Sequence, residues 1–314
     1  MNSLYKKKIN EIFHEIVEFE VPLSKLSQWK VGGRADVIIR PRNKNELIKV
    51  RQWLYLNGIN PLIIGNTTNL LFSDDDIHVV IVQIGTSFSK VAVNGLEIVA
   101  EPGIWVPSLA RLAMQTSLSG IEHICGIPGT LGGLVVMNGG SQRKGIGSVV
   151  AYVETIDNQG NIKRYTNPQC KFSYRQSIFQ NGDEIVVEVG LKLSNKRDKG
   201  DIRREMLEIL RSRRNKFPRK QPNCGSVFVS NPDMYEDYGP PGKIIEALGF
   251  KGLSQGNAQI SEQHANFIIN KGSAKSKDIL YLINIVKETV YNRTGYNMVV
   301  EAKLVTSNGE IISI

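Results

Sequence analysis

The stretch from Gly120 to Gly140 (GIEHICGIPGTLGGLVVMNGG) constrains the fold of this chain more than any other segment. It contains seven glycines and one proline, almost no charge, and several large apolar residues. Glycine permits positive φ angles and a very close approach of another group to the main chain. A loop of this kind can direct successive N–H groups at an anion, as nests and helix N-termini do. The stretch therefore favours a diphosphate ligand with an apolar body; the alternative is a buried turn between strands.

The spacing of these glycines is not that of the Rossmann dinucleotide fingerprint. Gly126, Gly129, Gly132 and Gly133 are spaced GxxGxxGG rather than GxGxxG. No acidic residue follows on a paired strand, where a ribose hydroxyl would need one. A dinucleotide bound at this loop would therefore require a different fold.

Length and composition indicate a globular protein of the cytoplasm. A chain of 314 residues is too long for one ordinary core and favours two or three domains. Its longest apolar run is far short of a membrane span, and residues 1–10 lack a signal-like apolar region. Cys125, Cys170 and Cys224 are too scattered for a disulfide framework or a metal site, as are the four histidines. We expect no metal, no membrane association and a reducing compartment.

The net charge of +9 is concentrated, because the segment from Arg203 to Lys220 holds eight basic residues. Basic and aromatic residues do not interleave as stacking platforms for nucleic acid would require. The segment favours attraction of phosphorylated small molecules, with a solvated helix face as the alternative. A catalytically silent nucleotide- or RNA-binding protein is the rival from another functional class.

Apolar patterning predicts one α+β domain between residues 31 and 194. We expect strands at 35–41, 61–65, 79–84 and 184–194, helices at 44–60 and 107–118, and hairpins at 91–100 and 149–166. The strand at 61–65 runs directly into Asn66-Thr67-Thr68-Asn69. Small polar residues at a strand end place side-chain and main-chain donors at its tip.

The composition shifts after residue 195, which predicts a separate lobe. A charged linker at 196–200 precedes an amphipathic basic helix at 201–216. We then expect a turn within 221–228 that leads into a strand, strands at 264–270 and 298–305, and helices at 243–248 and 275–293. The final strand is expected to return to the first domain.

Three polar side chains stand where a solvated surface would not require them. Arg175 lies between aromatic residues and can fork a carboxylate or phosphate, although its stem could simply pack on an apolar face. Ser226 enters an apolar strand after a tight turn, without the elbow motif of a hydrolase nucleophile, and can donate a proton to a carbanion. Glu301 interrupts an apolar strand and needs a partner or a task, unless it is exposed at a sheet edge.

The order and spacing of several motifs resemble those of the UDP-N-acetylenolpyruvoylglucosamine reductases. The similarity extends from Trp29 to Glu301. It is carried by the motifs Gly126-Ile127-Pro128-Gly129-Thr130, Met137-Asn138, Tyr174-Arg175-Gln176-Ser177, Asn223-Cys224-Gly225-Ser226-Val227-Phe228 and His264-Ala265-Asn266-Phe267. The chain is compact after Ser177, like the shorter subtype of this family that lacks an inserted tyrosine loop.

This resemblance implies an α+β fold with an FAD-binding domain of the vanillyl-alcohol-oxidase type and a C-terminal α+β substrate-binding lobe. The FAD-binding region would cover residues 1–195, in subdomains 1–75 and 76–195. The lobe would cover 200–297, and 298–314 would carry the strand that returns. The resemblance also implies a monomer without nucleic-acid or membrane partners.

The resemblance implies NADPH-dependent, FAD-mediated reduction of the enolpyruvyl group of UDP-N-acetylenolpyruvoylglucosamine to UDP-N-acetylmuramate. Ser226 would donate the proton, Arg175 would bind the substrate carboxylate and stabilise the developing charge, and Glu301 would assist proton delivery. Substrate contacts would come from Tyr174, Arg175, Lys216 and Gly225. FAD contacts would come from Gly65, Asn66, Thr67, Thr68, Asn69, Leu70, Gly126, Ile127, Pro128, Gly129, Thr130, Gly133, Asn138 and Gly139.

The sequence also departs from the family pattern. Thr67 and Thr68 stand where a second glycine and a serine are usual, and Ala302 follows Glu301 where valine is usual. These departures keep open a paralogous flavoenzyme of the same fold acting on another nucleotide sugar or small substrate. An oxidase is disfavoured, because it has no use for a proton donor at Ser226.

Overall fold

Short and strongly apolar strands form the first sheet. The computed structural model describes residues 3–180, 182–193, 195–230 and 232–314, and the strand order of this sheet is β1-β2-β5-β3. The strand β1 (Val17–Pro22) runs antiparallel to β2 (Arg34–Ile39), whereas β2 and β3 (Leu62–Ile64) run parallel to β5 (Ile77–Gln83). Apolar clusters cover both faces of this sheet, so β2 is buried at nearly every position instead of alternating.

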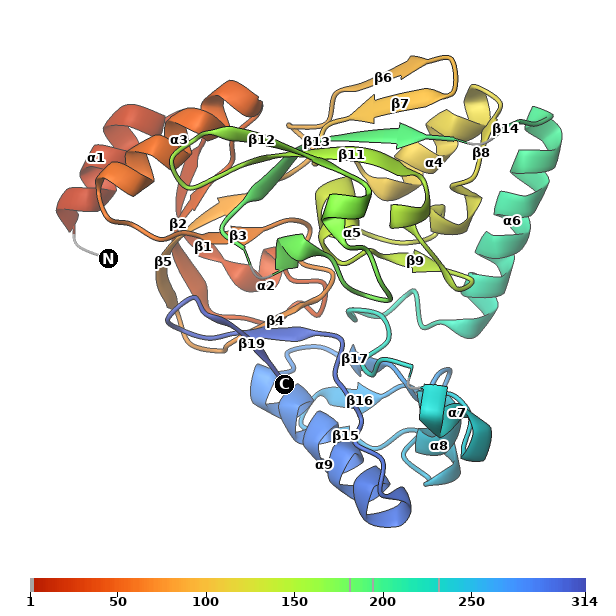
Figure 1. Cartoon of the computed structure of the whole chain (residues 1–314). Helices are drawn as coiled ribbons and strands as arrows, with labels where there is room; N and C mark the ends of the chain where they lie inside the picture. The colour runs from red at the N-terminus through yellow and green to blue at the C-terminus, as the bar shows by residue number, and fades with distance from the viewer. Residues whose placement is uncertain (1–2, 181, 194, 231) are drawn as a thin grey trace.

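Two helices cover one face of this sheet, α1 (Ser3–Phe13) and α3 (Lys44–Leu56) (Figure 1). The helix α3 begins at Lys44 because the side chain of Asn43 accepts a hydrogen bond from the Glu46 amide at 3.0 Å. The sequence predicted α3, but it did not predict α1 or β1, whose apolar positions are interrupted by charged residues.

The second sheet is entirely antiparallel, with the strand order β12-β11-β13-β7-β6. Its strands confirm the predicted hairpins at 91–100 and 149–166 and the predicted strand at 184–194. The helices α4 (Val106–Gln115) and α5 (Leu131–Val136) pack in its core. The strands are β6 (Val91–Asn94), β7 (Glu97–Ala100), β11 (Val150–Ile156), β12 (Ile162–Thr166) and β13 (Ile185–Lys192).

The basic helix α6 (Lys199–Lys216) packs on the second sheet's core rather than in the C-terminal lobe. Its inward residues Ile202, Met206 and Ile209 belong to the same buried cluster as α4 and α5. The helix starts inside the expected linker, because the Asp198 carboxylate accepts hydrogen bonds from the first amides. We therefore propose that the lobe begins after α6 rather than at residue 200, and that the first subdomain extends through β5.

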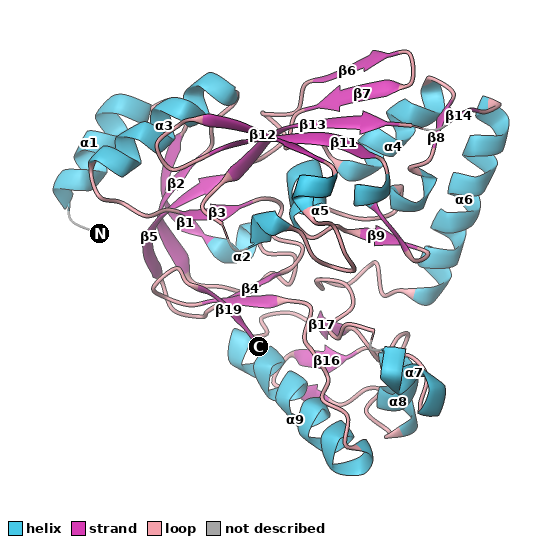
Figure 2. Cartoon of the chain, viewed as in Figure 1, coloured by secondary structure: helices cyan, strands magenta, loops and turns pink. Residues whose placement is uncertain are grey.

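In the C-terminal lobe a small antiparallel sheet lies beside a long helix (Figure 2), and the apolar side chains of the lobe form a cluster of their own. Trp29 and Leu71 from the first region join this cluster. Trp29 Nε1 donates a hydrogen bond to the Ile268 carbonyl at 2.7 Å, and Asn270 Nδ2 donates to the Trp29 carbonyl at 2.8 Å. These bonds tie the lobe to the first region. The lobe contains α7 (Pro232–Asp237), α8 (Pro241–Ala247), β15 (Ser254–Gln255), β16 (Ala258–Ile260), β17 (Ile268–Asn270) and α9 (Ser276–Thr294).

The last strands return to the loop that follows β3. The strand β18 (Lys303–Val305) pairs in parallel with β4 (Leu70–Phe72) and antiparallel with β19 (Ile311–Ser313). The strand predicted at 298–305 is therefore wrong over most of its length, and the strand expected after the turn in 221–228 is reduced to a single bridge at Phe228. Upstream of β18, Val300 makes only an isolated bridge to Phe228. Gly225, at φ +84°, breaks the extended run before Phe228.

Short elements complete the chain. They are α2 (Leu23–Leu26), β8 (Leu118–Ser119), β9 (Gly140–Ser141), β10 (Lys144–Gly145), β14 (Asn195–Lys196) and single 3₁₀ turns at Glu122–Ile124, Ile146–Ser148, Pro168–Cys170 and Ile178–Gln180. Across the described residues, no helix combines the length and apolarity needed to cross a bilayer.

Candidate active site

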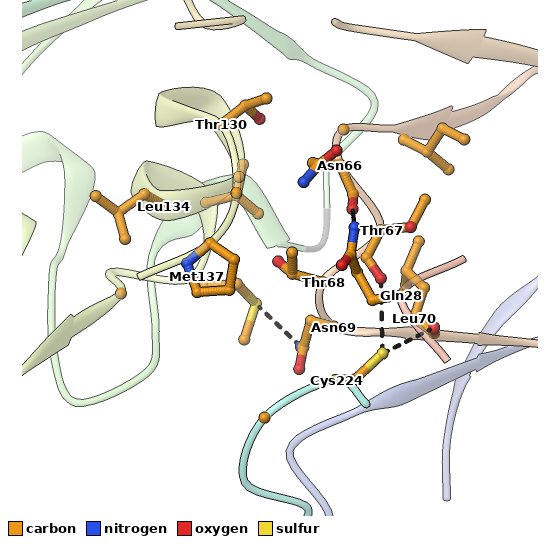
Figure 3. A pocket seen from close by; sticks show the side chains of 18 of the residues that line it. Gln28, Asn66, Thr67, Thr68, Asn69, Leu70, Thr130, Leu134, Met137 and Cys224 are labelled. Carbon is orange, nitrogen blue, oxygen red and sulfur yellow. Dashed lines mark hydrogen bonds between the residues drawn. The ribbon is translucent and has the colours of Figure 1, made fainter. Parts of the chain in front are cut away.

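A cavity of about 1280 Å³ lies where the first sheet, the glycine stretch and the C-terminal lobe meet. One wall is the loop between β3 and β4, and the opposite wall is the loop entering α5 (Figure 3). The segment 217–226 and Glu301 complete the lining. Residues that are far apart in the sequence therefore share one enclosed space.

The loop between β3 and β4 presents unpaired main-chain donors to this cavity. Among the described residues, the amides of Asn66, Thr67, Thr68 and Asn69 have no hydrogen-bond partner. Thr67 adopts φ +54°, a conformation that is rare for a β-branched residue, and its hydroxyl donates to the Leu26 carbonyl at 2.8 Å. That side-chain bond stabilises a backbone conformation in which these four amides find no acceptor among the described residues.

The glycine stretch presents a second row of donors from the facing wall. The Val106 amide donates to Gly129 O and the Leu131 amide to Ile104 O, both at 3.0 Å, which pins the loop at either side of Thr130. In the described chain, the amides of Gly126, Gly129 and Thr130 remain without a partner. A methyl group on Gly65 would come within 2.9 Å of Thr130 Oγ1, so the two walls touch at that point.

Arg175 and Glu301 form an ion pair in the cavity, with 2.9 Å between Nε and Oε1. Arg175 stands at the tip of a tight turn closed by main-chain bonds between Ser173 and Gln176, and its φ is +57°. Gln180 Nε2 donates to the Arg175 carbonyl at 2.8 Å and holds this turn. Burial raises the pKa of Glu301, and the positive charge of Arg175 opposes that effect.

Hydrogen bonds to the main chain of Glu301 connect it to the two segments beside it. Asn69 Nδ2 donates to the Glu301 carbonyl at 3.0 Å, and the Glu301 amide donates to the Val227 carbonyl at 2.8 Å. Ser226 precedes Val227 and also lines the cavity. The loop between β3 and β4 (the strand-tip loop), the main chain of Glu301 and the segment 223–228 (the serine segment) are thus linked directly.

Arg213 is a lining residue that the sequence did not single out. A methyl group on Gly126 would lie 2.6 Å from Arg213 Cδ, so this glycine makes room for the arginine. The guanidinium lies over the Phe217 ring at 5.0 Å, and no carboxylate among the described residues pairs with it. Burial lowers the pKa of Arg213, but a guanidinium stays protonated in proteins.

The charge of the cavity lining suits an anionic guest. Basic side chains outnumber acidic ones in this lining. The basic lining residues are Lys30, Arg51, Arg111, Arg175, Arg213, Arg219, Lys220 and Lys303, whereas the acidic ones are Asp183, Glu184 and Glu301. Such a surface attracts polyanions and raises their local concentration.

Most residues expected at the site line this cavity. They are Ser226, Arg175, Glu301, Gly225, Gly65, Asn66, Thr67, Thr68, Asn69, Leu70, Gly126, Ile127, Pro128, Gly129, Thr130, Gly133 and Gly139. Asn138, Tyr174 and Lys216 are not among the lining residues. The Asn138 side chain instead accepts from the Gly147 amide at 2.9 Å and donates to the Ser173 carbonyl at 2.7 Å. Tyr174 and Lys216 are exposed to solvent.

This combination of fold and cavity defines a protein with an FAD-binding domain joined to a separate C-terminal lobe. Residues 35–166 match the model of the FAD binding domain family. Residues 217–305 match the model described as UDP-N-acetylenolpyruvoylglucosamine reductase, C-terminal domain. The α+β fold with a flavin domain first and a smaller lobe second, as expected from the sequence, is confirmed.

Comparison with whole proteins identifies the family. The chain is 42% identical to UDP-N-acetylenolpyruvoylglucosamine reductase 1 of Corynebacterium glutamicum, over 93% of this chain and 87% of that one. It is 37% identical to the reductase of Caldanaerobacter subterraneus subsp. tengcongensis, over 97% and 99% of the two chains. The crystal structure of the reductase from Thermus caldophilus superposes with a TM-score of 0.78 at 29% identity, covering 90% of this chain and 97% of that one. The chain belongs to the UDP-N-acetylenolpyruvoylglucosamine reductase family.

Proposed function

We propose that this protein uses NADPH and FAD to reduce the enolpyruvyl group of UDP-N-acetylenolpyruvoylglucosamine to UDP-N-acetylmuramate, a precursor of peptidoglycan. One observation carries the proposal. Two rows of unpaired amides and the Arg175–Glu301 pair face the same basic cavity, beside Ser226. The names of the relatives agree with this reading.

The residues present fit FAD. The amides at 66–69 and at Gly126, Gly129 and Thr130, which find no acceptor among the described residues, are suited to the oxygens of a diphosphate. Without such a ligand, these donors would stay unsatisfied by the protein. The tight packing at Gly65 and Gly126 leaves no room for a side chain. The chemistry supplied at this site by bound FAD would be hydride transfer, from NADPH to the methylene carbon of the substrate.

The chain's own side chains account for the rest of the chemistry. Addition of hydride to the methylene carbon leaves negative charge at the carbon beside the carboxylate. We assign Arg175 to that carboxylate, because a guanidinium fork stabilises the developing charge in a partly buried site. We assign Ser226 to donation of a proton to the carbon beside the carboxylate, where the negative charge develops, with Glu301 supporting the transfer.

We assign Arg213 to a phosphate group of the nucleotide ligands. It lines the cavity and lacks a carboxylate partner in the described chain, whereas Lys216, the lysine expected from the sequence, is exposed outside the lining. NADPH and the sugar nucleotide are both polyanions, so the same basic lining residues suit either.

We further propose that the protein acts as a monomer in the cytoplasm.

Separate half-reactions test this function. The purified protein should be yellow, should bleach with NADPH in the absence of oxygen, and should regain its colour with UDP-N-acetylenolpyruvoylglucosamine. A colourless protein that cannot be reconstituted with FAD would support a silent nucleotide-binding role. Faster recolouring by a different nucleotide sugar would instead identify a paralogous reductase.

A further inference from the structure

The ion pair between Arg175 and Glu301 occupies a site that must receive another anion. Arg175 Nε lies 2.9 Å from Glu301 Oε1. This nitrogen is buried and has no aligned hydrogen-bond partner among the described residues, so the contact is electrostatic. The side chains of Arg175 and Glu301 are only 27% and 18% exposed, which limits screening by solvent. Within this pair, one positive charge therefore balances one negative charge.

Arg175 is the charged group of the described chain that acts on Glu301. From the strand-tip loop, Asn69 reaches the main-chain carbonyl of Glu301 and contributes no charge. From the serine segment, burial raises the pKa of the Cys224 thiol, which keeps it neutral. Lys303 turns its amine to Ser313 Oγ at 2.8 Å. The charge state of Glu301 thus depends on burial and on Arg175 alone.

A carboxylate arriving at Arg175 changes this balance. The three groups together would carry one net negative charge in a poorly solvated space, and two carboxylates sharing one cation cannot both remain ionised easily. Uptake of a proton from solvent by Glu301 restores neutrality without moving either side chain far.

We propose that binding of a carboxylate-bearing substrate at Arg175 is coupled to uptake of a proton by Glu301. The inference rests on the proposed function, which places the substrate carboxylate at Arg175. The binding step converts the Glu301 carboxylate and one solvent proton into a carboxylic acid, with no other bond changed. After Ser226 gives its proton to substrate carbon, the Glu301 acid returns a proton to the serine oxygen and becomes a carboxylate again. The chemical step thus begins with the second proton already on Glu301, taken up when the substrate binds.

Calorimetry on the oxidised holoenzyme measures this uptake without turnover. UDP-N-acetylenolpyruvoylglucosamine is titrated near neutral pH in buffers of different ionisation enthalpy, and the slope gives the protons bound. We expect an uptake approaching about one proton per substrate. UDP-N-acetylglucosamine, which lacks the carboxylate, should bind with an uptake near zero. In Glu301→Gln the enolpyruvyl substrate should still bind while its uptake is lost, whereas the exposed Glu288→Gln on α9 should retain it.

The outcomes separate the inference from the function on which it rests. Substrate binding with no proton uptake in the wild type, or equal uptake in Glu301→Gln, would overturn the inference alone. Equal uptake with UDP-N-acetylglucosamine would overturn it as well, because the carboxylate would then not be its cause. Failure of the substrate to reoxidise NADPH-reduced flavin would overturn the proposed function itself.

Discussion

The two sides of the cavity are built from different materials. The strand-tip loop and the glycine stretch, which face each other and together are called the main-chain side, offer main-chain amides, and the Thr67 side chain there holds its own loop. The other side, formed by Ser226, Arg175 and Glu301, offers functional groups at the ends of side chains. A main-chain site tolerates changes of side-chain chemistry but not of backbone space, and the reverse holds for the other side. Substitutions on the main-chain side should therefore weaken FAD binding, whereas substitutions on the other side should slow the chemistry of the substrate.

Removing the Ser226 hydroxyl should give the largest difference between the rates of the two half-reactions. In Ser226→Ala, reoxidation of the flavin by the enolpyruvyl substrate should slow by about 10²–10⁴-fold, because a positioned proton donor contributes that much. Reduction by NADPH should stay near the wild-type rate. Stopped-flow absorbance of each half-reaction gives both rates, with the exposed Ser212→Ala on α6 as control. Equal slowing of both half-reactions would remove the serine from this role.

Replacing the guanidinium fork should cost somewhat less. In Arg175→Lys, reoxidation should fall by roughly 10²–10³-fold, the typical loss when one charge-stabilising donor is removed. A lysine keeps the charge but cannot contact both carboxylate oxygens in a fixed plane. Flavin content and NADPH reduction should not change. Turnover close to wild type would rule out a bidentate contact with the substrate.

Adding a methyl group to the main-chain side should weaken FAD binding and leave the chemistry alone. Gly129 adopts φ +132°, and a methyl group there would lie 3.3 Å from Thr68 Oγ1. Strain of about 1–3 kcal/mol at such a φ predicts roughly tenfold or greater loss of FAD affinity in Gly129→Ala. Fluorescence titration of the apoprotein measures that affinity. Gly272→Ala is the matched control, because Gly272 has φ +120° but no atom within 4 Å. Parallel losses in both variants would point to general destabilisation.

The smallest expected effect is on the pH dependence of the free energy of unfolding, through a histidine in the glycine stretch. His123 is buried, and its Nε2 has no hydrogen-bond partner in the part of the chain that the structure describes. Burial, followed by the charge of Lys144, lowers the pKa of His123. As pH falls below about 6.5, the unfolded chain takes up this proton before the folded protein does, so the free energy of unfolding decreases. Above that pH the imidazole is neutral in both states and contributes no pH dependence.

Denaturant unfolding at about pH 7.5 and about pH 5.5 checks this prediction. The wild type should lose more stability on acidification than His123→Gln, and the exposed His14→Gln should behave like the wild type. The same acid sensitivity in all three proteins would assign the effect to other groups. Binding of the substrate carboxylate, in contrast, should respond to Glu301 and not to His123.

The sequence predicted the main-chain side better than the other one. Glycines and small polar residues after a strand are local signals, and both loops line the cavity as expected. Family matching also brought Ser226, Arg175 and Glu301 into one cavity, although 75 residues or more separate Glu301 from the other two. Thr67 is the local exception, because nothing in its sequence context indicates that its hydroxyl stabilises φ +54°.

What the sequence could not show is mainly side-chain direction and long-range packing. The family resemblance located Asn138 and Lys216 along the chain. It did not show that the Asn138 side chain stabilises a turn by hydrogen bonds or that Lys216 faces solvent. Arg213 was hidden among other basic residues. It does continue the helical stripe of Ile202, Met206 and Ile209, and that spacing was the available signal. The start of α6 inside an expected linker depended on one capping aspartate, Asp198.

The parallel pairing of β4 with β18 has a mechanical consequence. Lys303 pairs with Leu70, so the carboxylate two residues before β18 is held against the strand-tip loop by a ladder of main-chain bonds. The connection from Glu301 to Val227 extends this ladder to the serine segment. The three segments therefore form one stiff unit, in which Glu301 and Ser226 keep their alignment with the strand-tip loop.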